Sequence, residues 1–434
     1  MLNRIKLILN SIQMTFHSPY FGFIEGHDHL KGDILNKIKL LVGKNSANVV
    51  SDFEKRFAEL IGQGEAVSYA AARMGFYDLM RVMEIAKGDE VILLGATCSV
   101  MSTAVIRTGA TPIYADIDPD TLGSSCEAIE TCITNNTRMI VAQHSFGIPC
   151  NIIPIVKIAK DNNIFLLEDC ALTLGSKAND IVVGNFGDAA LFSSDHSKPI
   201  NTMIGGLIYT RDKKIESLLR SSRDLCKELP VKKQYAIWYR MLIERRFCNS
   251  KHYGKMQLID ILYSIGKKFF RITEPFLIDD YKSKVNIEEN PYPAKIPTFL
   301  AQLGIYEIAR WKSNLIMHKK TCYSLLDTLN KTNIQNFLPV AYKDLSLDIV
   351  PFRIVWTESK GPERRDVFNS FIRVDWTWFM DPIISTEEPL EELGYIYGSC
   401  PKSEIVTRGM VNLPTTNLAK EKDWLLAKLD FILS

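Results

Sequence analysis

Between residues 89 and 210, short apolar runs alternate with segments of helical periodicity, and this alternation restricts the possible folds more than any other feature. The runs predicted to be strands are 89–95, 111–117, 138–145, 163–169, 188–194 and 205–210. The predicted helices are 51–62, 72–86, 99–108, 124–133 and 151–161. Short apolar strands separated by helices are typical of a mostly parallel sheet covered by helices on both faces. The sequence therefore predicts an α/β fold class.

The first predicted helix, 51–62, carries its own start and stop signals. Ser51 and Glu54 have the spacing of a capping box, and Gly62 follows the last apolar residue. Phe53 and Phe57 lie on one apolar face at helical spacing. We therefore expect the helix to begin at Ser51 and to end at Gly62.

The composition excludes some classes of function. With 434 residues and 46% hydrophobic residues, the chain can build a sizeable core and two domains. The 52 basic and 50 acidic residues leave a formal charge of +2, which gives no global electrostatic case for nucleic acid as a partner. The nine cysteines lack CxxC or paired Cys/His spacing, which indicates neither a zinc site nor a disulfide framework. No metal is therefore expected.

The N-terminal stretch, residues 1–16, combines a basic residue near its start with a short apolar run that Asn10 and Gln13 interrupt. No small-residue cleavage site follows it, and no window reaches the roughly 18 apolar residues that a membrane span requires. Free cysteines fit a reducing compartment. We expect a cytoplasmic protein with an N-terminal arm over residues 1–50.

Three polar residues stand at or just beyond the ends of predicted strands: His144, Asp169 and Lys198. In sheets of this class, ligands bind outside the carboxyl ends of the strands. A desolvated lysine amine can form a Schiff base with a carbonyl, and pyridoxal phosphate (PLP) enzymes pair such a lysine with a carboxylate at the pyridine nitrogen. The alternatives are a solvated loop lysine, a turn or helix-capping aspartate, and a strand-end histidine whose hydrogen bonds are satisfied.

The segment from about 51 to 225 resembles the PLP-dependent nucleotide-sugar aminotransferases of the DegT/DnrJ/StrS type, which have the type I fold. The motifs that carry the resemblance are FEKRFAELIG, GDEVILL, GATPIYADIDPDTL, FLLEDCALTLG and VGNFGDAALFSSDHSK…GG. It is weaker from 290 onward. The resemblance implies that Lys198 is the Schiff-base lysine and that Asp169 partners the pyridine nitrogen. It further implies that Ser193 contacts the cofactor phosphate and that His144 lies near the site with a catalytic role.

Several positions depart from the pattern of this family. They are Ala71, Ala72 and Arg73 in place of Ser-Gly-Thr under the phosphate, Cys98 in place of an aromatic residue, Leu172 in place of glutamine, and Pro293 in place of an asparagine offered by a neighbouring subunit. Arg73 could replace the lost hydroxyl with a charge-assisted contact to the phosphate. Leu172 can only pack against the cofactor ring. The anchoring residues are thus retained, whereas the residues that support them have changed.

The resemblance implies an aminotransferase. It would move an amino group from an amino acid, expected to be glutamate, to a keto group of a nucleotide-linked sugar for a surface polysaccharide. A homodimer is expected, since the type I fold builds its sites at a two-fold interface. One alternative is a PLP-dependent sugar dehydratase, in which a histidine replaces the lysine; however, the register places Lys198, and not His196, at that position. Another is a non-catalytic binding or assembly module that retains the fold.

The resemblance also suggests a division of the chain. We expect an N-terminal arm at 1–50, a large PLP-binding domain at 51–225, a basic helical insertion at 226–290, and a long helix with a small α/β domain at 291–434. Residues 226–271 contain eleven Lys or Arg and three acidic residues.

Three roles for the insertion remain open. It could be structural, packed on the large domain through Leu258, Ile261, Leu262 and Ile265, which recur at helical spacing. It could form a positive wall that attracts the diphosphate of a nucleotide sugar, with Arg245 and Arg246 contributing. It could also be a helix on an anionic membrane surface.

Overall fold

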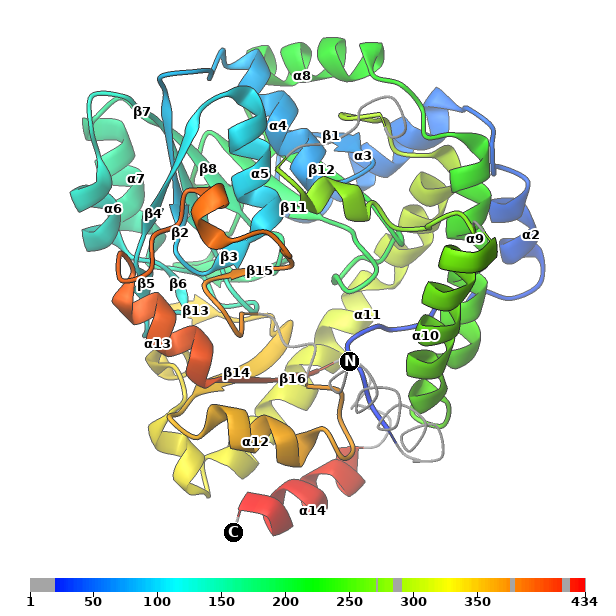
Figure 1. Ribbon diagram of the computed structural model, residues 1–434, viewed down its shortest axis with the longest axis vertical. Helices are drawn as coiled ribbons and strands as arrows, with labels where there is room; N and C mark the ends of the chain where they lie inside the picture. The colour runs from blue at the N-terminus through cyan, green and yellow to red at the C-terminus, as the bar shows by residue number, and fades with distance from the viewer. Residues whose placement is uncertain (1–19, 271, 284–290, 375–378, 416–421, 434) are drawn as a thin grey trace.

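The computed structural model describes residues 20–270, 272–283, 291–374, 379–415 and 422–433, and a seven-stranded sheet lies at its centre (Figure 1). In spatial order the strands are β1 (Glu65–Tyr69), β12 (Gly206–Thr210), β11 (Ala189–Ser193), β8 (Phe165–Asp169), β7 (Thr137–Gln143), β2 (Glu90–Leu94) and β4 (Thr111–Ala115). All neighbours pair in parallel except β12, which is antiparallel to both β1 and β11. The predicted mostly parallel sheet is confirmed.

Helices cover both faces of this sheet. They are α3 (Ala47–Ile61), α4 (Ala72–Val82), α5 (Ser99–Thr108), α6 (Cys126–Cys132), α7 (Ile152–Asp161) and α8 (Lys213–Leu225). Successive strand residues enter different cores: Val91 packs in the cluster that contains residues of α4 and α5, whereas Ile92 packs with residues of α6 and α7. The strands are therefore apolar on both faces, as buried parallel strands are.

The boundary signals in the sequence succeeded for one helix and failed for another. Helix α5 begins at Ser99 and ends at Thr108, and Gly109 follows it in the left-handed conformation, as predicted. Helix α3, however, begins at Ala47 with Ser46 as its N-cap, so the predicted start at Ser51 is wrong. Glu54 does not cap the helix; its buried carboxylate accepts hydrogen bonds from the N–H and hydroxyl of Ser68.

The C-terminal part of the chain builds a second core. The long helix α11 (Thr298–Leu329) leads into an antiparallel pair of strands, β14 (Arg353–Thr357) and β16 (Met410–Pro414). Helices α12 (Gly361–Phe368), α13 (Pro401–Gly409) and α14 (Lys422–Leu433) accompany them. Trp356 and Phe368 are fully buried between these elements, with ring centroids 5.9 Å apart. This part is a mixed α/β unit, as expected.

The remaining elements are short; one of them, α2, belongs to the N-terminal arm, and another, η1, belongs to the insertion. They are α2 (Asp33–Lys39), β3 (Thr97–Cys98), β5 (Ile117–Asp118), β6 (Gly123–Ser124), β9 (Lys177–Ala178), β10 (Ile181–Val182), β13 (Leu347–Asp348), β15 (Ile383–Ile384), and the 3₁₀ turns η1 (Ile278–Tyr281), η2 (Asn333–Asn336), η3 (Val340–Lys343) and η4 (Leu390–Leu393). The arm expected at 1–50 thus contains α2 and the start of α3, while residues 1–19 lie outside the described part.

The insertion forms two helices, α9 (Val231–Phe247) and α10 (Tyr253–Phe270), followed by η1. Its predicted packing is partly wrong, because Leu262 and Ile265 are exposed. Helix α9 instead buries residues such as Trp238 and Met241. Within the described ranges, no helix has the length and apolar character needed to cross a bilayer.

Candidate active site

One cavity of about 840 Å³ lies at the carboxyl ends of the parallel strands. Of the residues that the sequence singled out for the site, all but Pro293 line it: Ala71, Ala72, Arg73, Cys98, His144, Asp169, Leu172, Ser193 and Lys198. Its volume is in the range of pockets that hold small molecules and cofactors. The predicted convergence of these residues on one site is therefore present in the structure.

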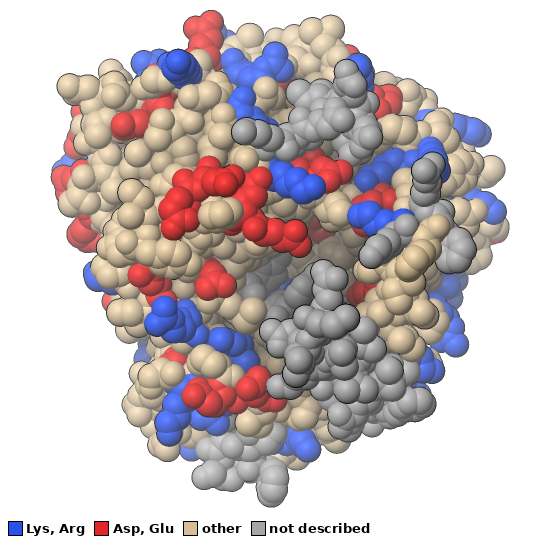
Figure 2. All heavy atoms as spheres, in the orientation of Figure 1, with Lys and Arg blue, Asp and Glu red and all other residues tan. Residues whose placement is uncertain are grey.

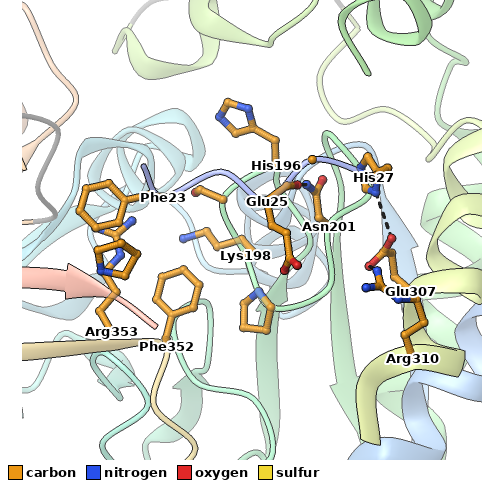
Figure 3. Close-up of a pocket in the computed structure, with 14 residues that line it drawn as sticks. Phe23, Glu25, His27, His196, Lys198, Asn201, Glu307, Arg310, Phe352 and Arg353 are labelled. Atoms are coloured by element: carbon orange, nitrogen blue, oxygen red, sulfur yellow. Dashed lines mark hydrogen bonds and ion pairs between the residues drawn. The ribbon is translucent and has the colours of Figure 1, made fainter. Parts of the chain in front are cut away.

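Lys198 lies in the loop that joins β11 to β12, and its neighbours hold the loop in a compact turn. The N–H of Lys198 donates to the carbonyl of Asp195 at 2.9 Å. Figure 3 shows its side chain extending toward Arg353 and Phe23. Removal from water lowers the pKa of the amine to about 8, although Asp195 acts in the opposite direction. Near neutral pH this lysine is thus a far better nucleophile than a solvated one.

Asp169 is the last residue of β8, and β8 is the direct neighbour of β11. Only 5% of Asp169 is exposed, and its Oδ1 accepts the N–H of Ala171 at 2.9 Å. Burial raises the pKa of this carboxyl, while the Ala171 N–H and the charge of Lys198 oppose that shift. A cation placed beside the carboxylate would restore its ionised form, and a protonated pyridine nitrogen is such a cation.

His144 follows β7 and is completely buried, with both ring nitrogens engaged away from the cavity. The N–H of Cys150 donates to Nδ1 at 3.0 Å, so the ring proton lies on Nε2, which faces Glu168 at 3.1 Å. Glu168 also accepts three backbone N–H groups, from Gly184, Phe186 and Gly187. The predicted catalytic role of His144 is therefore not supported as a proton transfer: the ring can offer the cavity a packing surface, and no ring nitrogen.

The start of α4 supplies backbone donors at the other end of the cavity. Its N-cap, Ala71, has no polar side chain to cap the helix, and the N–H of Met74 donates to the Ala71 carbonyl at 3.1 Å, so the N–H groups of Ala72 and Arg73 are the donors that a ligand could use. Gly206 permits this arrangement, because a Cβ atom there would lie 2.3 Å from the backbone of Ala72. Ser193, the last residue of β11, adds a hydroxyl to the same wall. These groups suit a phosphate.

Arg73 is engaged by the insertion. Its Nε donates to Asp280 at 2.9 Å and its Nη2 donates to the Leu277 carbonyl at 3.0 Å. The guanidinium also stacks on the ring of Tyr281, with 5.0 Å between the guanidinium carbon and the ring centroid. Contact between Arg73 and a phosphate remains a prediction, and any such phosphate would share the arginine with Asp280.

Cys98 and Leu172 contribute apolar surface to the cavity. Burial raises the pKa of the Cys98 thiol, so it stays protonated at neutral pH. Leu172 is buried and packs in the cluster that contains Phe146 and Phe379. Both can contact a flat ring through van der Waals packing.

The sequence did not reveal the other walls of the cavity. Phe23 comes from the N-terminal arm and Arg353 from β14, and the Arg353 guanidinium lies 3.6 Å above the Phe23 ring. The sequence did contain one signal for this wall, the arginine inside the apolar run VPFRIVW. Since arginine is rarely buried without a partner, its place in a buried strand indicates a site. Asp381 and Glu387 line the cavity near β15, and Figure 2 shows acidic side chains gathered over this segment.

The insertion also lines the cavity, through Arg240, Asp260, Tyr263, Ser264, Glu274, Pro275, Phe276, Leu277, Ile278 and Tyr281. Among the described basic residues of the insertion, Arg240 alone reaches the lining. Arg245 donates to the Leu30 carbonyl and Arg246 is exposed, so neither contributes to the positive wall that the sequence suggested.

Beside this site, His27, His29 and Glu307 bring three potential metal ligands together. Although burial acts to raise it, hydrogen bonds from the two histidines lower the pKa of Glu307 to about 2. Arg310 donates to Nδ1 of His29 at 2.6 Å, so the ring proton of His29 must lie on Nε2, which faces Glu307. As arranged, the cluster is a hydrogen-bonded network around a carboxylate, with His29 unable to bind a metal.

Comparison with known proteins places this geometry in context. A sequence model of the DegT/DnrJ/EryC1/StrS aminotransferase family matches residues 33–247. GDP-perosamine synthase of Escherichia coli O157:H7 is 38% identical over 169 residues, which are 39% of this chain and 46% of that protein. The spore coat polysaccharide biosynthesis protein SpsC of Bacillus subtilis strain 168 is 33% identical over 171 residues, 39% of this chain and 44% of that protein. The chain thus spans about half the length of these curated relatives.

Similarity of structure extends over the whole chain. The crystal structure of DesV from S. venezuelae, in complex with a ketimine intermediate, superposes with a TM-score of 0.70 at 17% identity. The match covers 96% of this chain and 99% of DesV. This likeness confirms the predicted type I fold, including the C-terminal part where the sequence resemblance was weak.

Proposed function

Since the sequence model of the DegT/DnrJ/EryC1/StrS aminotransferase family matches residues 33–247, we propose that the chain is a PLP-dependent aminotransferase of this family that acts on a nucleotide-linked keto sugar. The observation that carries the proposal is the pair formed by Lys198 and Asp169. A lysine with a pKa near 8 and a buried carboxylate line one cavity, from the ends of neighbouring parallel strands. This pair is what PLP chemistry requires of a protein.

The residues present fit the cofactor. Lys198 would hold it through its amine, Asp169 would hold a proton at the pyridine nitrogen, and Ser193 with the first turn of α4 would bind the phosphate. When bound, PLP supplies an electron-accepting ring that stabilises negative charge on the substrate carbon. Leu172 and the His144 ring line the same cavity and would exclude water from that ring by packing.

Lys198 has a second task as a proton carrier. When its amine is free, the lowered pKa of Lys198 would let Nζ take a proton from the carbon of the amino donor near neutral pH and give it back later in the reaction. No other lysine among the described residues lines this cavity. Lys198 would therefore serve both as the attachment point and as the general base.

The substrates are inferred from the relatives. The names of two relatives refer to a GDP-linked sugar and to a coat polysaccharide, which supports a nucleotide-linked keto sugar as acceptor and a surface glycan as the destination. Glutamate is the donor that we expect. We also infer a homodimer, because an isologous two-fold contact is the commonest arrangement of such enzymes.

The test is the chemistry of the purified protein. After incubation with PLP and reduction with borohydride, the wild type should gain the mass of a pyridoxyl group on Lys198. Lys198→Ala should gain none, while replacement of the exposed Lys213 should change nothing. With glutamate and a nucleotide keto sugar, the product should carry nitrogen from glutamate.

Other results would favour the alternatives. A product that has lost water and gained no nitrogen would identify a dehydratase. A protein that binds no PLP would identify a non-catalytic module.

A further inference from the structure

Charged side chains of alternating sign connect the loop of Lys198 to the insertion and to the C-terminal part. Nδ1 of His196, two residues before Lys198, lies 3.1 Å from Oε1 of Glu244 in α9. The same oxygen accepts Nε of Arg240 at 2.7 Å. Arg240 in turn donates to Asp260 at 2.7 Å, and Arg373 lies 3.8 Å from Asp260. The insertion thus contacts the loop of Lys198 through His196.

The contact between His196 and Glu244 is buried and charged. Glu244 is fully buried behind the cavity wall, whereas His196 lines the cavity. Burial acts to raise the pKa of Glu244, yet His196 and Arg240 hold it below its usual range. Burial acts to lower the pKa of His196, yet Glu244 and Asp195 raise it. Both shifts favour the ionised form of the pair, and removal of either partner takes this contact away from the other.

The groups around His196 fix the ring from several sides. The ring of Phe276, which follows α10, packs against it with centroids 4.4 Å apart. Asp195 of the same loop lies 3.6 Å from Nε2, on the side away from Glu244. The N–H of His196 donates to the carbonyl of Met203 across the loop at 3.1 Å. His196 therefore joins the insertion to both sides of the loop that carries Lys198.

We propose that Glu244 is a positioning residue for Lys198 and acts through His196. By holding the imidazole ring of His196, it fixes the turn at 194–205 so that the amine of Lys198 lies in the cavity that Asp169 also lines. A reacting group that is held in one orientation reacts faster, because the loss of conformational freedom has already occurred in the folded protein. That Lys198 reacts with PLP rests on the proposed function, whereas the orientation of its amine does not.

The structure offers a matched control for the test. Glu54 is also a buried carboxylate with two cationic partners, since it accepts Arg220 and Arg223, each at 2.7 Å. It does not line the cavity. E54Q should therefore match E244Q in lost stability, without an effect on Lys198.

The experiment compares wild type, E244Q, H196Q, the double variant E244Q/H196Q and E54Q. Two rates are measured by mass spectrometry: capture of PLP on Lys198 after borohydride reduction, and acetylation of Lys198 by acetic anhydride in the cofactor-free protein. Thermal unfolding is measured in parallel. E244Q and H196Q should each slow both rates by about tenfold, because Glu244 and His196 are in direct contact and each variant breaks that contact. The double variant should be no slower than either single variant, and E54Q should react as the wild type does.

Two results would overturn the proposal. One is that Lys198 reacts as fast in E244Q as in E54Q. The other is that the fold-decrease in rate of the double variant equals the product of the fold-decreases of the two single variants. If E244Q does not fold, H196Q provides the same comparison, because it removes the other half of the contact. If wild-type Lys198 captures no PLP, the proposed function fails, and the acetylation rates still decide whether Glu244 positions the amine.

Discussion

Acetylation of Lys198 in the cofactor-free protein should depend on pH with a midpoint near 8, because burial lowers the pKa of this amine from 10.5 to about 8. At pH 7 an amine with that pKa is neutral in roughly one molecule in ten, a neutral fraction roughly 300-fold greater than that of an ordinary lysine. Asp195 opposes the effect of burial, so Asp195→Asn should move the midpoint below that of the wild type.

The assay is acetylation with a trace of acetic anhydride across pH 6 to 11, followed by quantification of the peptide that contains Lys198. Acetylation of the exposed Lys213, measured in the same digest, serves as the reference for how much reagent is active at each pH. A wild-type midpoint near that of a free lysine, or a higher midpoint in Asp195→Asn, would show that burial does not control this amine.

Three further predictions concern other parts of the molecule. Asp169→Asn should still bind PLP but lose about 100-fold or more in transamination, measured with saturating donor, because the neutral amide cannot stabilise a protonated ring nitrogen. Gly206→Ala should lower the free energy of unfolding in urea by about 1–3 kcal/mol, since the added Cβ would lie 2.3 Å from Ala72. The pKa of Glu307 is about 2 in the folded protein, below its ordinary value, so its stabilisation is present above pH 4.5 and is lost as the pH falls toward 2; Glu307→Gln should flatten the melting temperature over that interval.

The local sequence pattern was sufficient to predict the sheet and the positions of Asp169 and Lys198. Strand periodicity and the Gly205-Gly206 bend are encoded within a few residues, so the positions of Asp169 and Lys198 at strand ends could be predicted. The start of α3 could not, because Ser51 and Glu54 have the right spacing while the pairing of Glu54 with Ser68 depends on tertiary packing.

The walls of the cavity depend on contacts between distant segments. Arg353 approaches Phe23 across 330 positions of the sequence, and no local periodicity reports such a contact. The orientation of His144 has the same origin, since Cys150 and Glu168 decide which way its nitrogens face. The sequence was sufficient to predict several residues that line the cavity, but it did not reveal the walls that Phe23, Arg353 and the insertion supply.

The two ends of the insertion meet. Lys227 and Ala294 form a parallel bridge, and the N–H of Lys295 donates to the carbonyl of Lys227 at 3.1 Å. A segment whose ends are adjacent can be lengthened, exchanged or lost in evolution while the rest of the chain keeps its path. Lys198 and Asp169 lie outside this segment, whereas an exchange would remove Glu244, the proposed positioning residue that contacts His196. Recombination at this junction would therefore change the part of the cavity lining that the insertion supplies, and under our proposal the new segment would also have to hold His196.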